Sequence, residues 1–257
     1  MKRVQRASFV AAGAAILLGI PALASATVTQ TGGQTAAGGQ AAASLAPATP
    51  ASGASESSGA VAVGSGGAVA SMDAGASQAG IDVLEHGGNA IDAAVATESA
   101  LGVTIPFVAG PGGGGFMVIY LAKTHQVITI DGRENCPAAC TTSMFIDPTT
   151  GKPLGYDYAS DQPLATGVPS MVATWAKAVS LYGRNSLAAD LQPAIDVATR
   201  GFRVNADFQQ LTESDLPELQ AYPASSSLLL TPQRNPLPVG YLLRNPDLAK
   251  TYRLLAE

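Results

Sequence analysis

Apolar residues recur at helical spacing in the central part of the chain. Residues 169–182 place apolar side chains at i, i+3, i+4 and i+7, with Trp175 among them. Residues 187–200 repeat the pattern with Leu191, Ala194, Ile195 and Ala198. This spacing puts the apolar side chains on one face, so it predicts two amphipathic helices packed on a core. Gly183 and Gly201 follow the two stretches, as glycine commonly follows a helix end.

Two further helices are predicted before this region. Asp73 can cap the first helix, and Gly87 and Gly88 end it. The second runs from about Asn89 to Leu101, with these residues on its packing side: Ile91, Ala94, Val95 and Ala96. Four acidic residues on these helices are interpreted as solvated or capping groups rather than as acid/base catalysts: Asp82, Glu85, Asp92 and Glu98.

A β-hairpin is predicted between these two helix pairs. Residues 116–122 form an apolar stretch, a polar turn follows, and residues 127–131 form a second stretch, which together predict two buried strands. The four glycines at 112–115 leave the backbone free to adopt positive φ and to approach another group closely. Arg133 follows the hairpin, and its planar fork of donors suits a carboxylate or a phosphate.

The remaining segments are more irregular. Residues 68–72 predict a short first strand, and residues 141–168 predict a loop because they are rich in Thr, Pro, Asp and Gly. Residues 205–216 predict a helix followed by a segment that its prolines break. Asn245, Pro246 and Asp247 predict the start of a last helix, since they supply an N-cap, a first-turn proline and a first-turn acid.

The N-terminal part of the chain predicts export. Residues 1–26 combine basic residues, an apolar run and an Ala-x-Ala cleavage site ending at Ala26, which are the parts of a signal peptide. The apolar run is shorter than the roughly 20 residues of a membrane span, so we expect no stable membrane insertion. Residues 27–58 predict a flexible low-complexity tether, because they contain no aromatic residue and one charge. Residues 59–257 remain as the folded region.

Charge and composition exclude several classes of function. The formal net charge is −5 and the sequence has no long basic run, which argues against nucleic acid as a partner. The chain has two histidines, and no His/Cys cluster with zinc spacing, so neither a metal nor another cofactor is expected. Cys136 and Cys140 fit either a local disulfide or two buried thiols, and their spacing does not choose between these states.

Taken by themselves, the residues do not provide a complete active site. There is no Gly-x-Ser-x-Gly nucleophile elbow with a partner histidine. The glycine run lacks the Lys-Ser/Thr ending of a phosphate loop and precedes a strand instead of a helix. Three interpretations of the run therefore remain: a substrate-lining loop, a structural turn and a phosphate cradle.

Six short blocks, in order, resemble the large-subunit portion of γ-glutamyltranspeptidase (glutathione hydrolase), an N-terminal nucleophile hydrolase. They cover roughly residues 67–257 and begin at Asp73, Gly87, Gly112, Asp131, Thr166 and Arg200. The resemblance implies an α+β fold, the αββα sandwich of N-terminal nucleophile hydrolases, of which this chain supplies part. It also implies γ-glutamyl transfer and hydrolysis on glutathione and other γ-glutamyl donors. In this family the nucleophile is the N-terminal Thr of a small subunit, so no catalytic residue is expected within this chain, and a heterodimer is expected.

The resemblance assigns one substrate-binding residue here. Arg133, in Asp131-Gly-Arg-Glu, matches the family arginine that holds the donor α-carboxylate, although Gly132 replaces the usual aromatic residue. An ion pair of Arg133 with Asp131 or Glu134 is the structural alternative. Two rival functions stay open: a catalytically inactive fragment or pseudoenzyme, and an acylase that acts on β-lactam side chains.

Overall fold

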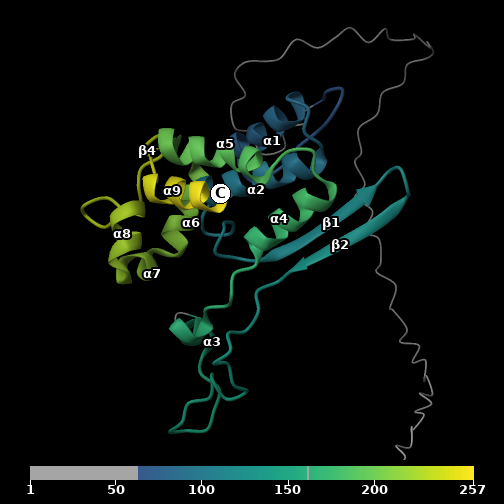
Figure 1. The fold of residues 1–257 in the computed structure, drawn as a ribbon. Helices are drawn as coiled ribbons and strands as arrows, with labels where there is room; N and C mark the ends of the chain where they lie inside the picture. Colours follow the sequence, from purple (N-terminus) through teal and green to yellow (C-terminus); the bar gives the residue numbers. More distant parts are fainter. Residues whose placement is uncertain (1–62, 161) are drawn as a thin grey trace, which may run out of the picture. The chain divides into compact units, whose positions relative to one another are not determined.

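The computed structural model describes residues 63–160 and 162–257, so the predicted signal peptide and tether lie outside the described residues (Figure 1). All described elements belong to one compact unit, residues 54–257. Its strands are β1 (Gly115–Leu121), β2 (Gln126–Gly132), β3 (Phe202–Arg203) and β4 (Leu242–Leu243). Its helices are α1 (Ala74–Glu85), α2 (Ala90–Thr104), α3 (Tyr156–Ser160), α4 (Met171–Tyr182), α5 (Leu187–Arg200), α6 (Ala206–Ser214), α7 (Leu216–Ala221), α8 (Pro223–Leu229) and α9 (Pro246–Leu255).

Side-chain caps fix where the first two helices begin. Asp73 Oδ1 accepts a hydrogen bond from the Ala76 amide at 2.8 Å, so α1 starts as predicted. Asn89 caps α2 and forms a capping box with Asp92. This helix continues three residues beyond the predicted end at Leu101, because residues 102–104 are buried against neighbouring elements. Ala94, predicted on the packing side, is exposed.

The helical core is built around Trp175 and Tyr252. Trp175 is 1% exposed and Tyr252 is 0% exposed, and the buried side chains around them come from α2, α4, α5 and α9. The Tyr252 hydroxyl donates to the Ser99 carbonyl at 2.9 Å, which ties α9 to α2. The prediction that Trp175 and the apolar face of residues 187–200 form core is confirmed.

Three sequence predictions are corrected. Residues 68–72 form no strand, since no strand in the described part of the chain lies alongside to share hydrogen bonds. The predicted helix 205–216 is α6, which starts at its Asn205 cap but ends at Ser214. Beyond it, Pro217 and Pro223 stand in the first turns of α7 and α8, where a missing amide costs little, so these prolines begin helices.

The hairpin β1–β2 is buried on one face only. The strands are antiparallel with Ile119 opposite Ile128. Ile119 and Ile130 pack with Ala178 of α4 in one cluster. The other face exposes four apolar side chains, each more than half accessible: Phe116, Val118, Tyr120 and Val127. The prediction of a buried hairpin is therefore wrong for this face. Within residues 63–160 and 162–257, no helix has the length and apolar character needed to cross a bilayer.

Candidate functional site

The glycine loop between α2 and β1 is joined to the end of the hairpin by the residues that precede α4. The Gly113 carbonyl accepts hydrogen bonds from the Ser170 amide at 3.2 Å and the Met171 amide at 3.0 Å. The Ser170 hydroxyl donates to the Gly132 carbonyl. Three segments that are far apart in sequence thus meet at the position where Arg133 emerges from β2.

Glycine is required at position 114 because there is no room for a side chain there. A Cβ on Gly114 would lie 2.5 Å from the Gly132 carbonyl oxygen and 2.8 Å from Cδ of Glu134. In this loop Gly110 has a φ of 138°, whereas none of the glycines at 112–115 has positive φ. Of the two reasons predicted for the run, close approach is confirmed at Gly114 but not at Gly112, and positive φ is found at none of the four glycines.

Arg133 lies at the edge of a cleft of about 550 Å³ that the glycine loop also lines. Its side chain is 69% exposed, and its Nε lies 3.3 Å from Oε2 of Glu134. The Arg133 backbone amide donates to Oδ1 of Asp131 at 3.0 Å. Neither Nη1 nor Nη2 makes a hydrogen bond or ion pair within the described residues. The structural alternative raised from the sequence is therefore present as an ion pair with Glu134, and the outer part of the fork faces no protein partner in that part of the chain.

The sequence suggested Glu134 as an ion-pair partner of Arg133 but did not show how the Glu134 side chain is held in place. Its side chain is wedged between two glycines, because a Cβ on Gly167 would lie 2.8 Å from Cβ of Glu134, and Gly114 lies on its other side. This wedge sets the carboxylate next to Arg133. The paired glycines at 114 and 167 were the available signal, but only the folded chain brings them together.

Three charged residues line the cleft: Arg133, Glu134 and, on α2, Glu98. Burial raises the pKa of the Glu98 carboxyl above its ordinary value. Burial also raises the pKa of the Tyr252 hydroxyl, and the Glu98 charge raises it further. None of the described residues that line this cleft is a Ser, Thr, Cys or His. The described lining of the cleft thus carries one cation, two carboxyl groups and no side-chain nucleophile, and the outer nitrogens of the cation are the groups available to an anion.

The remaining candidate residues lie elsewhere. His86 follows α1, where its Nδ1 lies 2.6 Å from the Asp82 carbonyl oxygen. His125 lies in the hairpin turn, with its Nδ1 2.9 Å from the Tyr120 hydroxyl. The described residues contain no group of three His, Cys, Asp or Glu side chains able to hold a metal ion.

The prediction for Asp92 on α2 is partly corrected. Asp92 caps its helix as predicted but is fully buried instead of solvated. It accepts hydrogen bonds from the backbone amides of Asn89, Arg184 and Asn185 at 2.7–3.2 Å. It therefore ties the start of α2 to the connection between α4 and α5, and no ligand is needed to explain it.

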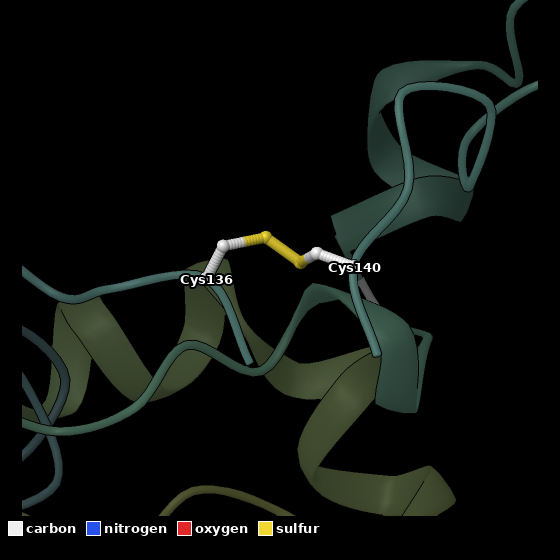
Figure 2. The surroundings of a disulfide bond; sticks show 2 residues. All are labelled: Cys136 and Cys140. Atoms are coloured by element: carbon white, nitrogen blue, oxygen red, sulfur yellow. A yellow bond between two sulfur atoms is a disulfide. The ribbon is translucent and has the colours of Figure 1, made fainter. Parts of the chain in front are cut away.

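The state of the two cysteines is decided by the structure. Cys136 and Cys140 form a disulfide with Cα atoms 6.0 Å apart (Figure 2). The bond closes a short loop that begins three residues after Arg133. Of the two alternatives left open by the spacing, the disulfide is the one observed.

Comparison with known proteins then shows the family. Residues 76–257 match the family described as Gamma-glutamyltranspeptidase. The chain belongs to the gamma-glutamyltranspeptidase family. It is 40% identical over 195 residues to the glutathione hydrolase proenzyme of Bacillus subtilis (strain 168), a match that covers 76% of this chain and 33% of that protein. The chain thus spans about a third of the length of the curated relatives it matches.

The structural comparison agrees with the family assignment. The crystal structure of Helicobacter pylori gamma-glutamyltranspeptidase matches with a TM-score of 0.72 and 33% identity, over 76% of this chain and 55% of that one. The expected fold class, α+β and part of the αββα sandwich of N-terminal nucleophile hydrolases, is confirmed. The chain is also 36% identical to the acylase ACY 1 proenzyme of Pseudomonas sp. (strain SE83), over 76% of this chain and 35% of that protein.

Proposed function

We propose that this chain is the large-subunit part of an enzyme that transfers or hydrolyses the γ-glutamyl group of glutathione and related donors. The observation that carries the proposal is Arg133, whose guanidinium stands exposed at the edge of a cleft beside the glycine loop. Nη1 and Nη2 are the part of the fork available to a ligand, and two parallel donors match the two oxygens of a carboxylate. We assign Arg133 to the α-carboxylate of the γ-glutamyl donor.

The bond-breaking groups are proposed to come from a small subunit. An N-terminal Thr would attack the γ-glutamyl carbonyl, with its own α-amino group as general base. Backbone amides would stabilise the oxyanion, and departure of the amine would leave a γ-glutamyl-enzyme ester. Water or an amino acid would then take up the γ-glutamyl group and release the Thr. This division of labour is consistent with a cleft whose described lining has no nucleophile.

The hairpin supports the proposal of a heterodimer. Phe116, Val118, Tyr120 and Val127 present a continuous apolar face on β1 and β2. Exposed apolar surface of this kind is typical of an interface, because leaving it in water is unfavourable. The relatives contain about two thirds of their length beyond the part matched here, and we assign this face to that part.

Export of the enzyme is proposed on the basis of the N-terminal sequence. Residues 1–26 would be removed near Ala26, and residues 27–58 would form a tether ahead of the folded region. N-terminal sequencing of the protein recovered outside the cytoplasm tests this, with Thr27 expected as the first residue. An intact Met1 in that fraction would contradict cleavage.

The function is tested on the protein expressed from its complete reading frame, assayed with γ-glutamyl-p-nitroanilide. We expect release of p-nitroaniline, and a gain in the rate when a dipeptide acceptor is added. Arg133→Ala should lower kcat/KM by about 10- to 150-fold, because a charge-assisted hydrogen-bonded contact contributes about 1.5–3 kcal/mol. Arg203→Ala is the control, since Arg203 donates to the Gly240 carbonyl and does not line the cleft.

Two other outcomes are defined by the same assay. An acylase of β-lactam side chains is the second candidate, since an acylase is among the relatives. Hydrolysis of a β-lactam amide side chain that has no terminal carboxylate, with little response to Arg133→Ala, would favour that acylase. No turnover of either substrate by the assembled protein would favour a catalytically inactive product.

A further inference from the structure

The segment that carries Arg133 is anchored on both sides by hydrogen bonds to the residues that precede α4. On one side the Gly132 carbonyl accepts from the Ser170 hydroxyl. On the other side the Asn135 carbonyl accepts from the Val168 amide at 2.8 Å, in an isolated antiparallel bridge. Arg133 and Glu134 are the two residues between these anchors. Their position therefore depends on both hydrogen bonds staying closed.

The outer anchor is the more vulnerable of the two. Beyond Asn135 the chain forms a long connecting segment, residues 136–166, called the excursion below. All of its described backbone hydrogen bonds are made within the segment itself. Several of its large apolar side chains are more than half exposed, including Tyr156, Tyr158 and Leu164. Motion of a segment with so few links to the rest of the unit would act first on the Asn135–Val168 bridge.

The disulfide lies at the junction between anchor and excursion. Cys136 follows Asn135 directly, and its bond to Cys140 closes a loop (Figure 2). Within this loop the Cys140 amide donates a hydrogen bond to the Pro137 carbonyl at 2.9 Å. A cross-linked loop of this size has few conformations. The residues next to the outer anchor are thus held in a fixed turn, whatever the rest of the excursion does.

We propose that the Cys136–Cys140 disulfide is a positioning element for donor binding, which keeps Arg133 and Glu134 preorganised. This inference rests on the proposed role of Arg133. The disulfide touches neither the donor nor the cleft, since neither cysteine lines it. Its effect on catalysis is therefore on the binding of the γ-glutamyl donor and not on the chemical step. Opening the disulfide lowers the fraction of molecules in which Arg133 is correctly placed, which weakens apparent affinity by that fraction.

The experiment compares oxidised and reduced forms of the protein expressed from its complete reading frame. Tris(2-carboxyethyl)phosphine supplies the two electrons that convert the disulfide to two thiols, and becomes the phosphine oxide with an oxygen from water. Mass spectrometry after alkylation verifies each state. With γ-glutamyl-p-nitroanilide, reduction is expected to raise KM by about 5- to 10-fold and to leave kcat within twofold. The variant Cys136→Ala/Cys140→Ala should match the reduced enzyme and should not respond to the phosphine.

Hydrogen exchange supplies a readout that does not depend on turnover. Reduction should speed exchange at the Val168 amide and leave the Tyr252 region of α9 unchanged. Equal exchange and equal KM in the two forms would overturn the inference, as would two free thiols in the purified, non-reduced protein. A fall in kcat without a change in KM would also overturn it. Failure of the proposed function would look different. In that case neither the oxidised nor the reduced form would turn over the donor, and the exchange measurement would still show whether the disulfide holds the Val168 amide in place.

Discussion

The helical core and the hairpin of this chain contain similar proportions of apolar residues but bury different fractions of their apolar surface. Around Trp175, helices α2, α4, α5 and α9 bury their apolar faces against one another. The hairpin buries Ile119 and Ile130 against α4 and leaves Phe116 and Val118 in solvent. The first region thus supplies its own packing partners, and the second offers a surface to something else. The proposed site lies at the end of the second region, where β2 leads into Arg133.

The largest effect is expected in the core. Trp175→Ala removes a side chain that is 1% exposed, and cutting a large aromatic residue to alanine in a core costs about 3–5 kcal/mol. The free energy of unfolding, measured by urea denaturation, should fall by that amount. Trp175→Phe keeps most of the volume and is the milder variant if the first does not fold. A loss below about 1 kcal/mol for Trp175→Ala would show that this core is not what stabilises the unit.

A smaller effect is expected at the glycine loop. Gly114→Ala places a Cβ 2.5 Å from the Gly132 carbonyl oxygen, so the loop must move, at a cost of about 1–3 kcal/mol. Gly112→Ala is the matched control, because no atom lies within 4 Å of its added Cβ. The free energy of unfolding, measured by urea denaturation, should fall for Gly114→Ala and hold for Gly112→Ala. Equal stability of the two variants would contradict the close approach.

A pH dependence is expected from Asp190 on α5, which is fully buried. Burial raises the pKa of the Asp190 carboxyl to about 6, with a further increase from Asp92 and an opposing hydrogen bond from Asn185. Between the ordinary pKa near 4 and the raised value, the folded state binds more protons than the unfolded state. Stability from this group is therefore fully present below about pH 4 and is lost as the pH rises through about 6.

Asp190→Asn tests this contribution. The variant should be less sensitive than the parent to a change from pH 4 to pH 7, as measured by thermal unfolding at both pH values. Asp196→Asn is the control, because Asp196 is on the same helix and pairs with Arg200 near the surface. An unchanged pH dependence in Asp190→Asn would refute the assignment.

The smallest effect on stability is expected on the open face of the hairpin. Val118→Ser changes a side chain that is 71% exposed, so the free energy of unfolding should change by less than about 0.5 kcal/mol. Assembly with the proposed small subunit should nevertheless weaken, as measured by co-purification. Thr129→Ser, at the position opposite Val118, is a milder change on the same face. Full assembly of Val118→Ser would argue against this face as the interface.

Local signals in the sequence predicted the helices well because caps and apolar spacing are decided within a few residues. Asp73, Asn89 and Asn245 each accept from a backbone amide of the first turn that follows. The residues 68–72 show the limit of this reasoning. They have strand-like composition, but a strand also needs a neighbour, and no described strand lies alongside. Proline gave a similar error, because the same residue ends one helix and begins another.

The sequence by itself determined the family, the order of the main helices and the hairpin, because these depend on short motifs and local periodicity. The same motifs carry the proposal of Arg133 as a binding residue. Tertiary structure decided what surrounds Arg133. Glycines 114 and 167 are distant in sequence, and only folding places Glu134 between them. Folding also joined Cys136 to Cys140, buried Asp92 and left one face of the hairpin exposed. Contacts of this kind form between segments that are distant in sequence, and the local spacing of apolar residues does not determine which distant segments come together.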